Sequence, residues 1–208
     1  DMVVIPDGGD SQGKTIEIAE KNLLWIRFHM QGKQAHGSRP DEGANACLAG
    51  YDLALRVNNL EKVFNKRDEL FEPPYSTFQP TKKESNVPNI NTIPGDDVFC
   101  MDCRILPCYK LEQVKSEIDK LVAQVENQYG VKIEYECPQQ VESPATPKDS
   151  DVVKLLSSGI KAVKNIESKT IGIGGGTVGS YLRNEGYQCA VWSTLDETAH
   201  QPDEYCVI

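Results

Sequence analysis

The stretch LEQVKSEIDKLVAQVENQYGVKIEYEC, residues 111–137, contains a helical pattern followed directly by a strand pattern. In its first part the apolar residues recur at steps of three and four, and they are Leu111, Val114, Ile118, Leu121, Val122, Val125 and Tyr129. This spacing predicts an amphipathic helix, and Gly130 follows where a glycine commonly ends one. In its second part apolar residues alternate with charged ones from Val131 to Cys137, which predicts a strand with one buried face.

The residues before this stretch predict a similar set of elements. Residues 22–30 alternate and predict a one-sided strand whose inner residues are Leu24, Ile26, Phe28 and Met30. Residues 45–64 predict a helix whose apolar positions are Cys47, Leu48, Tyr51, Leu55 and Val63. Two further strands are predicted at 76–85 and 98–106. The order βαββαβ predicts an α+β, ferredoxin-like domain, in which two helices cover one face of a four-stranded antiparallel sheet.

The pattern changes after residue 138 to alternating helices and strands, which predicts a parallel α/β arrangement. The predicted elements are a helix at 151–163, a strand at 169–173, a helix at 178–185 and a strand at 189–192. Two strands cannot bury two helices, so we expect partner strands upstream and a chain that is part of a longer protein. The predicted domains are 1–20 and 139–208, both from a partial α/β domain, with 21–138 inserted between them.

Composition excludes several classes of protein. The 208 residues include 22 Lys and Arg against 31 Asp and Glu, a net charge of −9, which argues against nucleic acid or an anionic membrane as the main partner. No apolar stretch approaches the roughly 20 residues that span a bilayer. The seven cysteines are an odd number spread along the chain, which favours a reducing cytoplasm over a disulfide-stapled secreted domain.

Two short motifs invite a functional interpretation. Cys100 and Cys103 have metal-site spacing, but in a predicted strand residues three apart point to opposite faces, so we do not expect them to share a metal. The GGGTVG motif at 174–179 lies between a predicted strand and helix, with Asp196 downstream, so a dinucleotide-binding domain is an alternative. More broadly, backbone N–H groups in such a loop can accept an anion of any kind.

The three histidines differ in setting. His29 lies on the polar face of a predicted strand and is expected at the surface. His36 lies in the polar loop GKQAHGSRP at 32–40, where an imidazole can act as a donor or base. His200 follows the last predicted strand, at the edge where open parallel sheets build their sites.

Four stretches, in this order, resemble a zinc-dependent family of metallopeptidases. They are GKQAHGSRPDEGANA at 32–46, NTIPG at 91–95 leading to DCR at 102–104, GGT at 175–177, and AHQPDE at 199–204. The family includes aminoacylases, acetylornithine deacetylases, succinyl-diaminopimelate desuccinylases and glutamate carboxypeptidases. With the βαββαβ insertion between them, the stretches cover nearly the whole chain.

The resemblance implies an architecture and a set of roles. In the family a catalytic α/β domain that binds two metal ions is interrupted by a four-stranded lid domain, through which the protein usually forms a homodimer. By resemblance Asp7 and His200 are metal ligands, with zinc expected and cobalt or manganese as alternatives. His36 is the catalytic lid histidine that reaches into the partner subunit's site and stabilises the oxyanion. The substrate-binding residues implied are Asn91, Arg104, Gly175, Gly176 and Thr177.

The implied activity is hydrolysis of an amide bond in N-acyl amino acids or small peptides by metal-activated water, as in deacetylases, desuccinylases and dipeptidases of amino-acid biosynthesis. The family's other metal ligands and its catalytic Glu lie upstream of the position of Asp7, so the chain alone is expected to be inactive. Val178 stands where many members of the family that this chain resembles carry an acidic residue, so their substrate preference is not carried over to this chain. The alternatives are a non-catalytic dimerisation module and, less favoured, the dinucleotide-binding domain.

Overall fold

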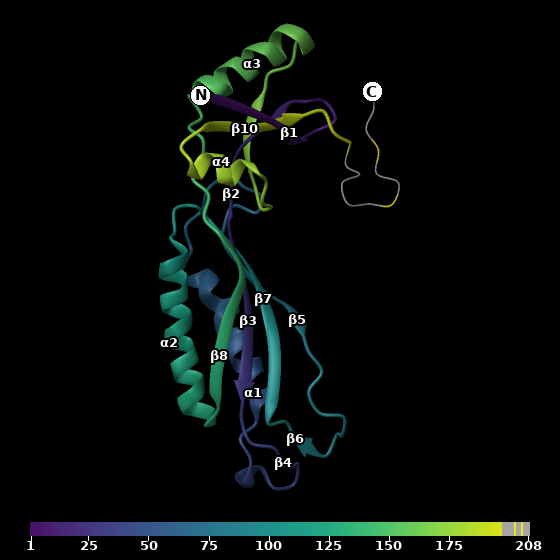
Figure 1. Cartoon of the computed structure of the whole chain (residues 1–208), viewed down its shortest axis with the longest axis vertical. Coiled ribbons are helices and arrows are strands. Elements are labelled where there is room, and N and C mark those ends of the chain that lie inside the picture. The colour runs from purple at the N-terminus through teal and green to yellow at the C-terminus, as the bar shows by residue number, and fades with distance from the viewer. Residues whose placement is uncertain (197–201, 203–204, 206–208) are drawn as a thin grey trace. The chain divides into compact units, whose positions relative to one another are not determined.

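The computed structural model describes residues 1–196, 202 and 205, which divide into two compact units (Figure 1). Unit 1 comprises Asp1–Lys21, Asp68–Pro74 and Glu142–Ile208, and unit 2 comprises Asn22–Arg67 and Tyr75–Val141. The short segment Asp68–Pro74, which the sequence analysis includes in the inserted domain, therefore belongs to unit 1.

Unit 2 is built on a four-stranded antiparallel sheet in the order β5-β7-β3-β8. Its strands are β3 (Asn22–Gln31), β5 (Thr77–Lys83), β7 (Asp96–Ile105) and β8 (Lys132–Val141). The central strands β3 and β7 pair without interruption, from Asn22 opposite Ile105 to Gln31 opposite Asp96. Helices α1 (Ala46–Asn58) and α2 (Leu111–Tyr129) supply the remaining elements, so the predicted α+β class and antiparallel sheet are confirmed.

The core of unit 2 lies between this sheet and the two helices. The alternation of β3 places Leu24, Ile26, Phe28 and Met30 in the core at 0–1% exposure, and Phe28 stacks on Phe99 with ring centroids 4.9 Å apart. Helix α2 ends at Gly130, whose φ of 64° is the left-handed conformation that glycine adopts without strain.

Helix α1 does not bury the apolar positions whose spacing predicts a helix here. The residues that α1 buries are the small or medium-sized Ala46, Ala49, Gly50, Leu53 and Val57. Leu48, Tyr51 and Leu55 lie on the other side of the helix and are 50–64% exposed. The buried side of α1 approaches the sheet closely at Gly50, because a Cβ on Gly50 would lie 2.8 Å from Met30 and closer still to Asp97. Helix α1 therefore has an outward apolar face.

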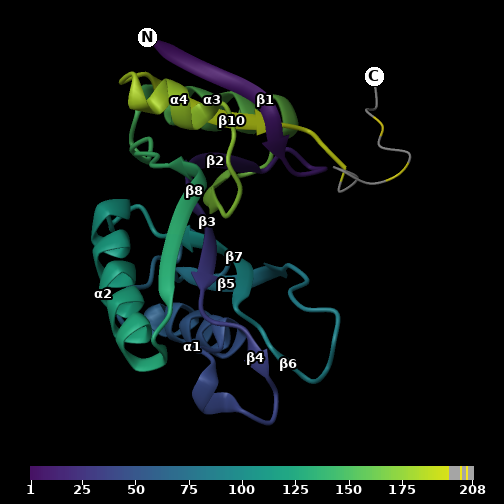
Figure 2. The same ribbon diagram turned by 60° about the horizontal axis from the view of Figure 1, so that its bottom comes forward.

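A small two-stranded sheet lies at one end of unit 2, beyond the end of β3 (Figure 2). It pairs β4 (Ala35–His36) with β6 (Thr92–Ile93) and was not predicted from the sequence. The 3₁₀ turns η1 (Pro40–Glu42) and η2 (Asn59–Lys62) complete the unit.

Unit 1 contains a mixed sheet in the order β1-β10-β2-β9. Its strands are β1 (Met2–Gly9), β2 (Thr15–Glu20), β9 (Lys169–Ile173) and β10 (Gln188–Ser193), and its helices are α3 (Asp151–Lys164) and α4 (Gly179–Asn184). The β1–β10 and β2–β9 pairs are parallel, but β10 and β2 are antiparallel. The prediction of a parallel sheet is therefore only partly right, and β2 itself was missed.

Both faces of this sheet carry a helix. Along β10, Ala190 and Trp192 pack in the cluster that includes α3, whereas Cys189 and Val191 pack on the side of Leu182 in α4. No helix in the described part of the chain is long and apolar enough to cross a membrane.

Strand β2 turns two glutamates toward a buried arginine. Its pairing with β9 shifts register between Glu17 and Ala19, and this bulge breaks the alternation that would put Glu20 on the same face as Ile18. Glu20 Oε1 accepts a hydrogen bond from Arg183 Nη1 at 2.9 Å, and both side chains are 2% exposed. A buried charge of this kind requires a partner, and each residue is the other's partner.

Glu17 is less well compensated. It is 7% exposed, and its Oε2 has no hydrogen-bond partner among the described residues. Burial raises its pKa from 4.5 to about 7, with a further increase from the nearby Glu20 carboxylate, against a hydrogen bond from Gly9 N–H and the charge of Arg183. Ionised Glu17 therefore destabilises the fold at neutral pH.

Glu17→Gln should make the chain more stable at neutral pH but not at acid pH. Between pH 4.5 and about 7 the folded state binds more protons at Glu17 than the unfolded state, so the stability of the wild-type chain falls as pH rises. The free energy of unfolding of the variant should equal that of the wild type around pH 4.5 and should exceed it by about 3 kcal/mol above pH 7.

Denaturant unfolding across this pH range measures the difference. The exposed Glu185→Gln is the matched control and should follow the wild type at every pH. Parallel pH profiles for wild type and Glu17→Gln would contradict the burial argument.

Candidate functional site

The predicted site residues fall in both units, and one lies outside the described residues. Asp7 and the loop 175–177 belong to unit 1, and His36, Asn91 and Arg104 belong to unit 2. His200 lies outside the described part of the chain.

Asp7 lies near the carboxyl end of β1, where the strand leaves its regular pairing. The register with β10 is interrupted between Ile5 and Gly9, and the Asp7 side chain is exposed. Gly9 has φ of 138°, and a Cβ there would lie 2.2 Å from the backbone oxygen of Ser193, so only glycine fits this approach. The local backbone therefore presents a carboxylate at the end of a strand.

A metal site does not follow from the described residues alone. Across residues 1–196, 202 and 205, no three His, Cys, Asp or Glu side chains are grouped so that they would hold a metal ion. Asp7 supplies one oxygen ligand, and the imidazole that the resemblance pairs with it is His200. A carboxylate and an imidazole suit zinc, but two ligands do not make a closed site.

The glycine-rich loop between β9 and α4 is held by Glu20. Thr177 donates its backbone N–H to Glu20 Oε2 at 3.0 Å and its hydroxyl to Glu20 Oε1 at 2.5 Å. Arg183 neutralises the same carboxylate. Thr177 thus directs two donors at a protein carboxylate, and the exposed backbone of the loop is that of Gly175 and Gly176. A pyrophosphate at Thr177 would face the Glu20 carboxylate, which disfavours the dinucleotide alternative.

His36 and Asn91 lie together on the small sheet of unit 2. His36 pairs with Thr92 across β4 and β6, and Gly37 N–H donates to the Asn91 backbone oxygen at 2.6 Å. A Cβ on Gly37 would lie 3.0 Å from that oxygen, so the glycine permits the close contact. Both His36 and Asn91 are exposed, so each can be reached by a polar ligand.

The loop that carries Asn91 has a buried anchor. Asp97, which is 1% exposed, pairs with Lys83 and accepts a hydrogen bond from Asn86 Nδ2 at 3.0 Å. These contacts fix both the start of the 84–91 loop and the strand that follows it. No sequence pattern indicates Asp97, Glu20 or Arg183, because each forms its ion pair with a residue that is distant in sequence.

Arg104 on β7 forms a bidentate ion pair with Asp102, two residues earlier on the same strand. Arg104 Nε and Nη2 donate to the two Asp102 oxygens at 2.6 and 2.8 Å, and Trp25 Nε1 donates to Asp102 Oδ2 at 3.1 Å. The ion pair holds the guanidinium in one orientation, and a substrate carboxylate would have to compete with Asp102 for these two donors.

The structure does not bring Arg104 together with His36 and Asn91 within one chain. Arg104 lies eight residues along β7 from Asp96, which at about 3.3 Å per residue is roughly 26 Å. The small sheet of β4 and β6 lies beyond the Asp96 end of β7 (Figure 1). One small substrate therefore cannot contact both groups in a single chain.

The two cysteines of the C-x-x-C motif differ in environment. Cys103 is fully buried in the core, and burial raises the pKa of its thiol well above the usual range. Cys100, three residues earlier on the same strand, is half-buried.

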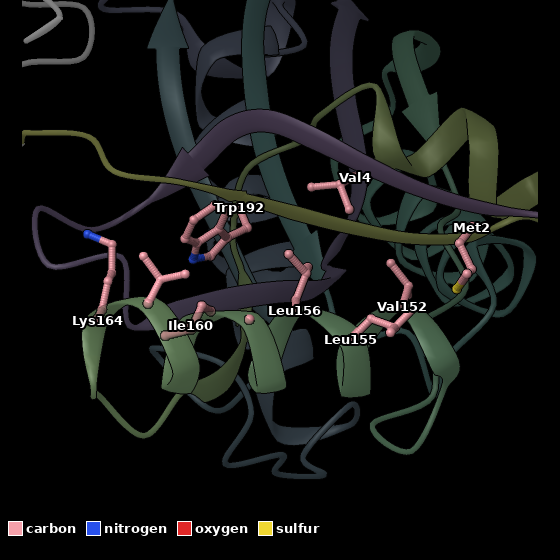
Figure 3. A pocket seen from close by; sticks show the side chains of 10 residues that line it. Met2, Val4, Val152, Leu155, Leu156, Ile160, Lys164 and Trp192 are labelled. Carbon is pink, nitrogen blue, oxygen red and sulfur yellow. The ribbon is translucent and has the colours of Figure 1, made fainter.

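An apolar groove of about 410 Å³ lies between α3 and strands β1 and β10 (Figure 3). Side chains of Val152, Leu156 and Ile160 point from α3 toward Val4 and Trp192 on the strands. Lys164 is the one charged residue that lines it. Among the described residues that line the groove, the Lys164 amine is therefore the one titratable group, and the groove leaves apolar surface of unit 1 open.

Comparisons with known proteins place the chain in a family. Residues 18–130 match the family described as the peptidase dimerisation domain. The whole chain is 42% identical to an uncharacterised metallohydrolase of Methanococcus maripaludis and 40% identical to one of Methanocaldococcus jannaschii, covering 54% and 53% of those proteins. It is 22% identical to a succinyl-diaminopimelate desuccinylase of Hydrogenovibrio crunogenus over 98% of the chain and 52% of that enzyme. The chain spans about half the length of these relatives.

Solved structures share the fold. A tripeptidase from Staphylococcus aureus matches 98% of this chain and 51% of its own with a TM-score of 0.78 at 20% identity. The aminopeptidase PepT from Bacillus cereus matches 96% of this chain and 50% of its own with a TM-score of 0.79 at 16% identity. The matched domain and the metallohydrolase relatives together show that the chain belongs to the M20 metallopeptidase family and contains its dimerisation domain.

Proposed function

We propose that this chain is part of a zinc-dependent amidohydrolase that cleaves N-acyl amino acids or small peptides. The observation that carries the proposal is the exposed His36 on β4, which pairs with Thr92 of β6 and precedes Gly37, whose N–H donates to the Asn91 carbonyl, on a domain of the dimerising type. The metallohydrolase and desuccinylase relatives support hydrolysis as the reaction class.

In this proposal Asp7 and His200 are two of the ligands for a pair of zinc ions, with cobalt or manganese as substitutes. The metal, when bound, would activate the attacking water. Of these two ligands, Asp7 lies among the described residues and His200 lies outside them, and the proposal takes the further ligands from the half of the relatives that this chain does not span.

The roles of the other residues follow from their chemistry. The His36 imidazole would donate a hydrogen bond to the oxygen that becomes negatively charged as the amide is attacked, with Asn91 beside it. Arg104 would bind a substrate carboxylate, for which Asp102 holds its guanidinium ready. The backbone of Gly175 and Gly176 would contact a second polar group of the substrate.

The distance between these groups supports a homodimer with a shared site. Arg104 and the His36–Asn91 pair are separated by most of the length of β7, so a substrate that needs both must receive them from different subunits. The family's dimerisation domain covers both regions.

We propose that the outward face of α1 and the edge strand β5 form the dimer contact. A groove of about 510 Å³ runs between them and is lined by Tyr51, Ala54 and Leu55 of α1 and by Pro80, Lys82 and Lys83 of β5 among others. A second copy would cover this apolar surface and the open edge of the sheet.

The first prediction from the proposed function concerns His36 in the longer protein with its metal. His36→Gln should lower kcat on an N-acyl amino acid or dipeptide by about 10²–10³-fold, because one oxyanion donor is lost. His29→Gln is the matched control, since His29 bonds Asp96 at 2.5 Å on the sheet surface, and it should keep full activity. Chelation of the metal should abolish the activity of the wild type and of His29→Gln. Chelator-resistant hydrolysis, or equal activity of the two variants, would refute the assignment.

The second prediction tests the shared site. His36→Gln and Arg104→Met subunits should each be inactive, but mixing and exchanging them should restore up to about a quarter of wild-type activity, because half of the dimers then contain one intact site. The control is a mixture of His36→Gln with Asn91→Ala. In the proposal one subunit supplies both His36 and Asn91 to a site, so no site in this mixture is intact and activity should not recover. Absence of recovery after verified subunit exchange would contradict a site shared in this way.

The third prediction concerns the dimer of the chain as it stands. Leu55→Glu should convert the dimer to a monomer in sedimentation velocity, because a charge would be buried in the contact. Leu155→Glu on α3 is the matched control, since Leu155 is 60% exposed against 64% for Leu55, and it should leave the dimer intact. A monomeric wild type, or a dimeric Leu55→Glu, would count against the α1 contact.

A further inference from the structure

We propose that Ser38 is a positioning residue that fixes the proton of neutral His36 on Nε2. The inference deepens the proposed function, because it specifies which atom of His36 is the hydrogen-bond donor. It rests on contacts within one loop of unit 2.

Two donors of Ser38 meet the same ring nitrogen. Ser38 backbone N–H donates to His36 Nδ1 at 3.2 Å, and Ser38 Oγ lies 2.8 Å from the same atom. A hydroxyl can donate or accept, so the Oγ contact alone would fit either tautomer. A backbone N–H can only donate, so Nδ1 must be the acceptor.

The opposite tautomer is disfavoured by this geometry. With its proton on Nδ1, the ring would direct an N–H at the Ser38 N–H, and the two hydrogens would repel each other. In neutral imidazole one nitrogen carries the proton and the other accepts. Acceptance at Nδ1 therefore leaves Nε2–H as the one donor of the His36 ring.

The backbone around Ser38 keeps its N–H directed at the ring. Arg39 N–H donates to the His36 carbonyl at 2.8 Å and closes a turn over Gly37 and Ser38. Gly37 N–H is bound to the Asn91 carbonyl on the neighbouring strand. At the base of the loop, Lys33 and Ala44 exchange two backbone hydrogen bonds at 2.9 Å each. Ser38 is therefore fixed relative to the strand that carries His36.

The consequence is a donor that is free to meet a ligand. His36 is exposed, and no Nε2 contact is found for it among the described residues. His29 differs, because its Nε2 is already bonded to Asp96. A neutral donor with a fixed proton matches the requirement for stabilising a developing oxyanion, which needs an N–H in place before the charge appears.

The test is ¹⁵N nuclear magnetic resonance of the histidine rings in this chain, at a pH well above the ordinary histidine value of about 6.5. His29→Gln and His200→Gln assign the His36 signals. We expect Nδ1 to resonate as an unprotonated ring nitrogen, Nε2 as a protonated one, and the Ser38 amide to show scalar coupling to Nδ1 across the hydrogen bond. A predominant Nδ1–H form would overturn the proposal.

Two variants separate Ser38 from the intrinsic preference of imidazole for Nε2–H. Ser38→Ala keeps the backbone donor and should keep the tautomer. Replacing the Ser38 amide by an ester puts an oxygen that cannot donate in place of the N–H and should lower the ratio of Nε2–H to Nδ1–H by at least about fivefold, which corresponds to the loss of one hydrogen bond. An unchanged ratio in the ester variant would also overturn the proposal.

This outcome is independent of catalysis. If the tautomer is as expected and His36→Gln is fully active in the longer protein, the proposed function fails while the role of Ser38 stands. If His36→Gln is inactive and Nδ1 carries the proton, the role of Ser38 fails while the proposed function stands.

Discussion

The ten-residue antiparallel ladder between β3 and β7 is the constraint on which the arrangement of unit 2 depends. It pairs every residue from Asn22 to Gln31 with a residue of β7, so the sheet cannot shorten or slide without exposing its core. The ladder separates Arg104 at one end from the sheet of β4 and β6 at the other. Two groups with affinity for polar ligands are thus held apart by the same hydrogen bonds that fold the domain, and a second subunit is the simplest way to bring such groups together.

Unit 1 buries charged side chains beside a loop whose Gly175 and Gly176 are exposed. Glu20 accepts three hydrogen bonds, one from Arg183 and two from Thr177, so its charge is satisfied in a place that water does not reach. The result is a rigid turn into α4 whose glycines remain exposed. Glu17 on the same strand has no such set of donors, and its raised pKa is the consequence. The two glutamates differ in their partners, since Glu20 bonds Arg183 directly whereas Glu17 Oε2 has no hydrogen-bond partner among the described residues.

The local patterns of the sequence predicted α2, β3, β7 and β8 correctly, because each of these elements buries one regular face. They failed where packing is decided by contacts distant in sequence. Helix α1 has apolar residues on two sides, and only the side with Ala49, Gly50 and Leu53 is buried against the sheet, which the hydrophobic pattern of the sequence cannot distinguish. Strand β2 was missed because its glutamates look exposed until Arg183, 163 residues away, is placed beside Glu20. The proximity of His36 to Asn91 likewise depends on a pairing that spans a large part of unit 2, and the resemblance to a family, rather than spacing, indicated both residues.

The outward face of α1 connects these observations. A helix that places leucine and tyrosine in solvent loses the free energy that their burial would provide, so such a face is retained most readily where a partner covers it. If the same contact also brings Arg104 of one subunit to His36 of another, association and catalysis depend on one equilibrium, and the fraction of complete sites follows the concentration of subunits by mass action. The net charge of −9 on each chain opposes that association, and the opposition weakens as salt screens it. Association of this chain with a second copy should therefore strengthen as ionic strength rises, which is the reverse of what a contact held together by surface ion pairs would do.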